Sequence, residues 1–187
     1  SNDQSSLFTH STTSWNASWE FSVALTFNPS SNNYCRIYIM SSSTDPSNSS
    51  SYYVQLGGNS SDKISLFKKA GNSTTLLVES ADDLLDKPRV DVRIRVERDS
   101  IGALKLYADT SSSFFLIGQH VDNAILTSSF FGWSCHYTST RSDRFYLDSI
   151  IISGNEYIDS IPPQITNAQF LNTNSLLLQF DEKLNDQ

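Results

Sequence analysis

Strict alternation of apolar and polar residues is the feature that most constrains how this chain can fold. In SWEFSVALTFN, residues 18–28, every second residue from Trp19 to Phe27 is apolar, and polar or small residues lie between them. The stretch VDVRIRVER, residues 90–98, alternates valine and isoleucine with charged residues in the same way. Because successive side chains of a β-strand point to opposite faces, each stretch predicts a long strand with one buried face.

Further strand candidates follow at short intervals, separated by polar turns. They are NYCRIYIMS, SYYVQLG, DKISLFKKA, TTLLVES, GALKLYAD, SFFLIGQ, SFFGWSCHYT and RFYLDSIIIS. Helical periodicity is weak throughout, and the best candidate, residues 79–88, predicts at most one or two helical turns before Pro88. About ten strands in the first 155 or so residues predict an all-β protein, a two-sheet antiparallel sandwich or barrel.

Composition narrows the class of protein. The chain has 187 residues, is rich in serine, and only 18% of its residues are charged. This balance is typical of an extracellular β-protein, and we expect an extracellular or cell-surface location with the leader absent. The net charge of −7 argues against nucleic-acid binding, which needs a basic surface to neutralise phosphates. No run approaches the roughly 18 apolar residues of a membrane span. We also expect the protein to be a monomer.

The two cysteines, Cys35 and Cys135, do not form a metal-type or redox motif. Each falls on the apolar side of its predicted strand, which is usual for a buried, unreactive thiol. We expect free thiols, with a single disulfide as the alternative. Sequence alone does not place the two strands within the roughly 6 Å Cα separation that a disulfide needs.

The last part of the chain differs in character. We place a sandwich domain at residues 1–158 and a separate segment at 159–187. The segment begins with a proline-containing linker, DSIPPQIT, because two prolines interrupt a strand ladder. One more strand is predicted within SLLLQFDEKLN, residues 175–185. So short a segment cannot form its own core, so we interpret it as the start of a following module or as a docked hairpin.

Several motifs in order resemble a known family. The stretches YYVQLGG, DKISLFKKAG, VDVRIRVERDSIGALKLYAD and FFGWSCHYTSTRSDRFYLDSIIISG resemble the concanavalin A-like, laminin-G-like domains of bacterial surface or secreted proteins. The C-terminal stretch PPQITNAQFLNTNSLLLQFDEKLND resembles the opening strands of a bacterial Ig-like module. The resemblance implies a two-sheet jelly roll with a non-catalytic role, neighbouring domains in the same polypeptide, and no particular ligand.

Concanavalin A-like folds include glycoside hydrolases, which need a pair of converging carboxyl groups. A Glu-x-Asp-x-Glu pattern on a strand would supply such a pair, but the five glutamates lie far apart in this sequence. We therefore predict no catalytic residues. Laminin-G-like domains can hold Ca²⁺ at a rim, and Asp109, Asp122 and Asp143 near predicted strand ends are weak calcium candidates. Loop aspartates more often form Asx turns, so we expect no resident cofactor.

A ligand face is predicted opposite the apolar side of the strand at 33–41. Tyrosine rings stack on the C–H faces of sugars, and arginine, glutamine and histidine hydrogen-bond to hydroxyl groups. The histidine joins this face only if its strand belongs to the same sheet. The candidate glycan-binding residues are Tyr34, Arg36, Tyr38, Tyr53, Gln55 and His136.

Three functions are therefore weighed. The first is a non-catalytic extracellular module of a larger surface protein that binds a glycan. The second is a structural spacer or protein-contact domain without a small ligand. The third, which the absent carboxylate pattern disfavours, is a glycoside hydrolase. The first predicts exposed rings in a groove, and the second predicts a filled or flat face together with an exposed apolar patch.

Overall fold

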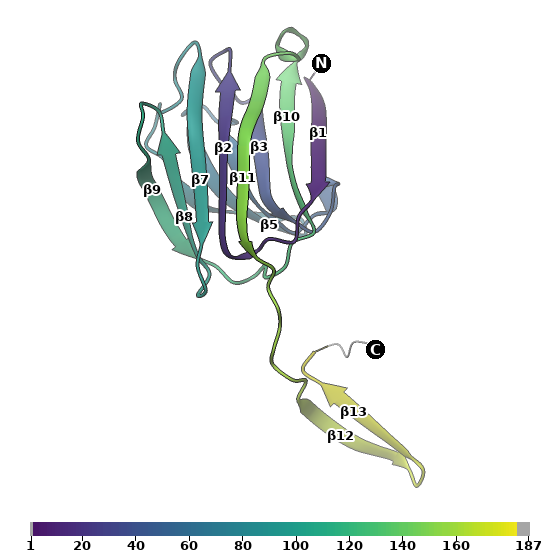
Figure 1. The fold of residues 1–187 in the computed structure, drawn as a ribbon. Coiled ribbons are helices and arrows are strands. Elements are labelled where there is room, and N and C mark those ends of the chain that lie inside the picture. Colours follow the sequence, from purple (N-terminus) through teal and green to yellow (C-terminus); the bar gives the residue numbers. More distant parts are fainter. Residues whose placement is uncertain (1, 183–187) are drawn as a thin grey trace. The chain divides into compact units, whose positions relative to one another are not determined.

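The computed structural model describes residues 2–182 of the chain, which form strands and short 3₁₀ turns (Figure 1). No α-helix is present within this range. The strands are β1 Asn2–His10, β2 Trp15–Leu25, β3 Tyr34–Ser41, β4 Ser51–Leu56, β5 Ile64–Ala70, β6 Ser73–Glu79, β7 Val90–Arg98, β8 Ala103–Asp109, β9 Phe115–Val121, β10 Phe130–Thr138, β11 Phe145–Asn155, β12 Ile165–Asn172 and β13 Ser175–Phe180. The 3₁₀ turns are η1 Pro46–Asn48 and η2 Ser139–Arg141.

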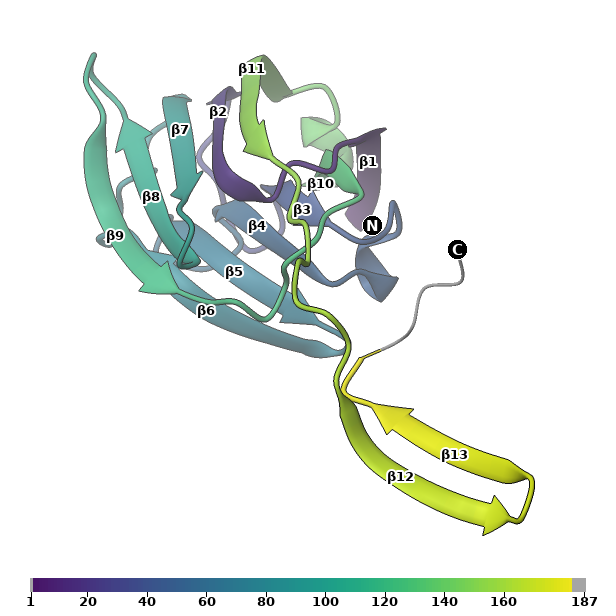
Figure 2. The same cartoon turned by 60° about the horizontal axis from the view of Figure 1, so that its bottom comes forward.

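Two antiparallel sheets form a sandwich (Figure 1). The six-stranded sheet has the order β1-β10-β3-β4-β5-β6, and the five-stranded sheet has the order β11-β2-β7-β8-β9. The edge strands β6 and β9 contact each other, so one side of the sandwich is closed (Figure 2). The predicted all-β jelly-roll sandwich is confirmed.

The core lies between the two sheets and follows the alternation of the sequence. In β2 the residues Trp19, Phe21, Val23 and Leu25 are almost fully buried, and the intervening residues are partly exposed. In β7 the pattern is the same, with Asp91, Arg93, Arg95 and Glu97 on the outer face, except that the last residue, Arg98, is charged and buried. On β10, Phe131 and Cys135 join the core as their parity predicts. Each strand therefore presents one face to the core and one to the outside.

The structure also contains elements that the alternation did not reveal. β1 pairs with β10 along its whole length, although its sequence NDQSSLFTH is mostly polar. An edge strand has a neighbour on one side only, so its register depends on backbone pairing more than on an apolar pattern.

Within residues 79–88, Glu79 ends β6 and residues 82–85 form a turn, so the one or two helical turns expected there at most are absent. The amides of Asp83 and Leu85 donate to the carbonyls of Ser61 and Asp62 in a neighbouring loop, at 2.8 and 2.9 Å. These amides are therefore not available for helical hydrogen bonds. Leu85 is buried in the core, which ties the turn to the sandwich.

The chain divides into two compact units, Ser1–Tyr157 and Ile158–Gln187. In the second unit β12 and β13 form a two-stranded antiparallel hairpin. β13 is the strand predicted near the C-terminus, and its last predicted residues lie outside the described range. A strand at the place of β12 was implied only by the resemblance to the opening strands of an Ig-like module and by the hairpin alternative. The Ig-like relationship of this unit has no support beyond the sequence resemblance and stays a prediction.

Candidate functional site

The six predicted ligand residues come together on the outer face of the six-stranded sheet. β10 pairs with β3, so His136 lies opposite Tyr34 in the register. β3 pairs with β4, which places Arg36 opposite Gln55 and Tyr38 opposite Tyr53. The condition that the histidine strand belongs to the same sheet is therefore met.

These side chains contact one another closely. The rings of Tyr34 and His136 are stacked, with centroids 4.9 Å apart. The guanidinium carbon of Arg36 lies 5.2 Å from the ring centroids of both Tyr34 and Tyr53, which is within cation–π range. Arg36 Nε donates to Gln55 Oε1 at 2.8 Å. The polar members of the face are thus hydrogen-bonded to each other and stacked on the rings.

A row of four rings crosses the same face. Phe8, Tyr38, Tyr53 and Phe67 come from β1, β3, β4 and β5, with neighbouring centroids 5.3, 5.3 and 5.4 Å apart. Gly132 makes room for this row, because a Cβ atom there would lie 2.2 Å from Phe8 Cδ1. We call the whole set the aromatic layer. Its members are Phe8, Tyr34, Arg36, Tyr38, Tyr53, Gln55, Phe67 and His136.

The middle of the aromatic layer is closed to solvent. Tyr38 and Tyr53 are only 1% and 3% exposed, and Gln55 is 7% exposed. Burial also raises the pKa of Tyr53. These three residues therefore hold the layer together but offer no open ring to a ligand. The half-buried Tyr34, Arg36 and His136 are the predicted residues that a ligand can reach.

The outer face of the five-stranded sheet carries a hollow of about 760 Å³, which we call the polar hollow. Two cross-strand rows build it. Tyr146, Ala24 and Asp91 are register neighbours on β11, β2 and β7. The second row runs from Asp148 through Ser22 and Arg93 to Asp109 on β8. The lining also includes Thr26, Arg89 and the loop residues Thr110, Ser111 and Ser112.

Ion pairs and backbone bonds fix the walls of the polar hollow. Arg89 donates two hydrogen bonds to Asp91, at 2.6 and 3.0 Å. Asp109 Oδ1 accepts from the amides of Ser111 and Ser112, at 2.9 and 2.6 Å, and its other oxygen pairs with Arg93 at 3.4 Å. The two loop amides, and to a smaller extent Arg93, lower the pKa of Asp109. Its carboxyl group is thus an ionised acceptor and not a proton donor.

The sequence analysis missed the polar hollow. Its residues come from β2, β7, β8, β11 and a loop, and the pairing of these strands is not visible in the sequence. The available signal was the small size of Ser22 and Ala24 on the outward side of a long strand. When a strand with small outward side chains lies between two strands with larger ones, the face of the sheet has a depression along that strand.

The three calcium candidates lie in different surroundings. Asp109 holds the loop beside the polar hollow. Asp143 lies on the connection after η2, and its closest charged partner is Arg144 at 4.0 Å. Asp122 belongs to the network described below. Among residues 2–182, no group of three or more histidine, cysteine, aspartate or glutamate side chains is arranged to hold a metal ion. The calcium prediction therefore gains no support from the geometry.

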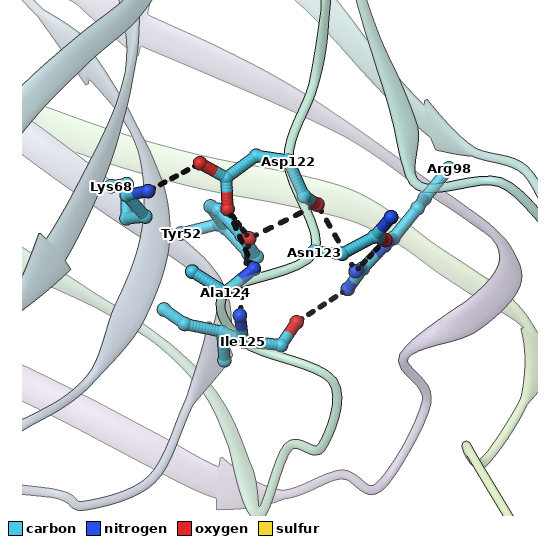
Figure 3. A network of polar contacts seen from close by, with 7 residues as sticks. All are labelled: Tyr52, Lys68, Arg98, Asp122, Asn123, Ala124 and Ile125. Atoms are coloured by element: carbon cyan, nitrogen blue, oxygen red, sulfur yellow. Dashed lines mark hydrogen bonds and ion pairs between the residues drawn. The ribbon is translucent and has the colours of Figure 1, made fainter.

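Asp122 anchors the connection between β9 and β10 (Figure 3). Its carboxylate accepts from Tyr52 Oη at 2.5 Å and from the Ala124 amide at 2.9 Å, and it forms an ion pair with Lys68. Burial alone would raise the pKa of Asp122, but the bonds from Lys68, Tyr52 and Ala124 together lower it. The carboxylate is therefore a structural acceptor already used by the protein.

Arg98 holds the other side of the same connection (Figure 3). The residue is 2% exposed, and its guanidinium donates to the carbonyl oxygens of Ile125 at 2.8 Å and of Asp122 at 3.3 Å. It also lies over the rings of Trp15 and Tyr52. Backbone carbonyls and ring faces thus replace most of the water that a buried guanidinium has lost, although Nε has no hydrogen-bond partner among the described residues. This polar cluster is structural and is closed to a ligand.

Cys35 and Cys135 are free thiols and register partners on β3 and β10. Burial raises the pKa of both, that of Cys135 to about 12. Neither thiol is therefore an ionised nucleophile near neutral pH.

An apolar groove of about 240 Å³ runs between β1, β10 and β11. Leu7 and Ile150, which line it, are 70% and 46% exposed, and the neighbouring Ile151 is 61% exposed. This is the kind of exposed apolar patch that the spacer or protein-contact interpretation predicts.

No family model matches the sequence, and no curated protein was found to match it. Solved structures do share the fold. The VIP36 exoplasmic/lumenal domain, in a Ca²⁺- and Man3GlcNAc-bound form, is 16% identical, with a TM-score of 0.60 over 86% of this chain and 77% of that one. The Emp47p carbohydrate recognition domain is 12% identical, with a TM-score of 0.57 over 78% and 75% of the two chains.

The carbohydrate-binding module CBM66 from Bacillus subtilis is 11% identical, with a TM-score of 0.52 over 78% of this chain and 82% of that one. These likenesses show the fold, a jelly-roll sandwich of the concanavalin A-like type. No helix among the described residues is long and apolar enough to cross a membrane.

Proposed function

We propose that this chain is a non-catalytic, glycan-binding module of a larger exported or cell-surface protein. The observation that carries the proposal is the accessible end of the aromatic layer, where Tyr34 is stacked on His136 and Arg36 lies beside it. A sugar ring can stack on such a platform while the guanidinium and imidazole groups bind its hydroxyls. The likeness in fold to carbohydrate-recognition domains supports this proposal.

The buried members of the layer support the platform. Gln55 holds the guanidinium of Arg36, and Tyr53 lies beneath it. Because these partners fix Arg36 and Tyr34 before a ligand arrives, binding costs less side-chain entropy.

The test is glycan-array binding by the purified protein, with a Tyr34→Ala/His136→Ala variant beside it. We expect the variant to lose at least about tenfold in affinity, because it removes the stacking platform but leaves Tyr38 and Tyr53 in place. His120→Ala is the matched control, since His120 is an exposed histidine on β9 of the other sheet. An affinity that is unchanged in the double variant would exclude this site.

The same array in the presence and absence of Ca²⁺ tests the calcium prediction. Binding that needs Ca²⁺ would require ligands that the described side chains do not bring together. Incubation with the bound glycan should give no cleavage product, because a glycoside hydrolase needs a pair of carboxyl groups at the sugar and the aromatic layer contains no aspartate or glutamate.

The second candidate is a spacer or protein-contact domain. The dense packing of Tyr38 and Tyr53 and the exposed apolar groove beside Leu7 and Ile150 favour it. Under this alternative no glycan binds in any condition, and Leu7→Ser weakens the contact with a neighbouring domain of the same polypeptide.

A further inference from the structure

The polar hollow owes its shape to the size of the residues on three neighbouring strands. β2, the middle strand, presents Ser22 and Ala24 outward, and its neighbours present larger side chains at the same level. Adjacent strands lie about 4.8 Å apart, so the walls on β11 and β7 stand roughly 10 Å apart. The result is a depression with a floor of small side chains and a volume typical of small-molecule sites.

One wall offers an aromatic ring. Tyr146 on β11 is 53% exposed, in contrast to the buried tyrosines of the aromatic layer. Its hydroxyl group donates to the carbonyl oxygen of Asp143 at 3.2 Å, which fixes the edge of the ring. An anchored, exposed ring beside a hollow suits stacking against the C–H face of a sugar.

The opposite wall offers hydrogen-bonding groups whose charges are already compensated. Asp91 is paired with Arg89, and Arg93 bridges Asp109 and Glu20. Ion-paired carboxylate and guanidinium groups keep free lone pairs and N–H donors, and the hydroxyl groups of Ser22 and Thr26 add both kinds. Such a wall can bind many hydroxyl groups but does not favour a ligand of either charge.

The backbone on both sides of the polar hollow is held in an unusual conformation. Ser149, beside Asp148, has φ 52°, and Ser112, at the loop held by Asp109, has φ 129°. Positive φ costs free energy in a residue with a side chain, and such residues concentrate at ligand sites where the surroundings fix them. Two residues with positive φ therefore flank the polar hollow.

From these observations we infer that the polar hollow is a second binding site, which takes a short neutral saccharide of one or two units. The sugar stacks on Tyr146 over the floor of Ser22 and Ala24, and its hydroxyls bind Asp148 on one side and Asp91 and Arg93 on the other. The site lies on the other sheet from the aromatic layer and shares no residue with it, so it does not depend on the function proposed above.

The test is a titration of ¹⁵N-labelled protein with a panel of neutral hexoses and their disaccharides, followed by amide chemical shifts. We expect shifts at Ser22, Ala24, Asp91 and Arg93. Ala24→Tyr fills the hollow from an outward strand position and should weaken binding by more than about tenfold. Lys105→Tyr, an outward substitution on β8 outside the hollow, is the matched control and should leave binding unchanged.

A second pair of variants tests the ring alone. Tyr146→Ala should weaken binding about tenfold, and Tyr146→Phe, which keeps the ring, should retain most of it. Melting temperatures close to that of the wild type show that each variant is folded.

The inference would be overturned by no shift at the four amides with any neutral saccharide, by equal binding in Ala24→Tyr, or by binding of charged sugars only. The Tyr34→Ala/His136→Ala variant separates the two sites. If that variant alone abolishes saccharide binding, the aromatic layer is the site and this inference is wrong. If binding survives there but is lost in Ala24→Tyr, the polar hollow is the site and the aromatic layer is not.

Discussion

The two outer faces of the sandwich differ in how their outward side chains are packed. On the six-stranded sheet, large outward residues occupy neighbouring strands at the same level, so Tyr38 and Tyr53 are buried by ring-to-ring contact. On the five-stranded sheet, the small residues Ser22 and Ala24 separate the larger ones, and a hollow is left. Tyr146, whose cross-strand neighbour is the small Ala24, is therefore far more exposed than Tyr38, whose cross-strand neighbour is Tyr53.

The largest effect that this comparison predicts is on stability. Tyr38→Ala removes a ring packed between Phe8 and Tyr53 and should lower the free energy of unfolding by about 3 kcal/mol. Tyr146→Ala removes a ring that is half exposed and should change it by less than about 0.5 kcal/mol. Urea unfolding of both variants measures the difference. Equal losses would mean that the aromatic layer is not packed as described.

A smaller loss is expected from Gly132→Ala. The added methyl group would lie 2.5 Å or less from two atoms of the Phe8 ring and 2.7 Å from the Leu7 carbonyl oxygen. The ring must move off the aromatic layer, which should cost about 2 kcal/mol in the free energy of unfolding. Gly71→Ala is the comparison outside the layer, because no atom lies within 4 Å of its added Cβ and only its positive φ resists the change. A Gly132→Ala variant as stable as Gly71→Ala would show that Phe8 does not occupy this place.

Much of the architecture was predictable because period-two alternation reports directly on burial. The strands around Trp19, Val92 and Phe131 and their inward faces follow from it. The pairing of β10 with β3, which brings His136 to Tyr34, does not follow from the alternation, because register depends on contacts between distant parts of the chain. For the same reason the sequence indicated which residues face outward but not that Tyr38 and Tyr53 would cover each other.

The dependence of stability on pH separates buried groups from surface groups. Burial raises the pKa of Cys35, Cys135 and Tyr53, and burial together with the bond to Asp122 raises that of Tyr52. The unfolded chain loses these protons first, so stability is full below about pH 8.5 and falls as pH rises toward 12. Each group that stays protonated only in the folded state should cost about 1.4 kcal/mol per pH unit in that window.

Urea unfolding at pH 8, 9 and 10 measures this decline, and Cys135→Ala should make it shallower. A free energy of unfolding that stays constant over this range would mean that the two thiols are reached by solvent. Filling the polar hollow with Ala24→Tyr should leave the slope unchanged, because that substitution alters the outer surface only.

The paired positions of Cys35 and Cys135 have a consequence beyond packing. Directly opposed residues on antiparallel strands have Cα atoms about 4.5–5.5 Å apart, which is within the span of a disulfide. Oxidising surroundings can therefore link β3 to β10 with little movement of the backbone, and reducing surroundings keep the two thiols apart. The intact mass of protein recovered from its native source measures this, because the disulfide makes the protein lighter by two hydrogen atoms. The mass would therefore show whether the chain folded in an oxidising or a reducing compartment.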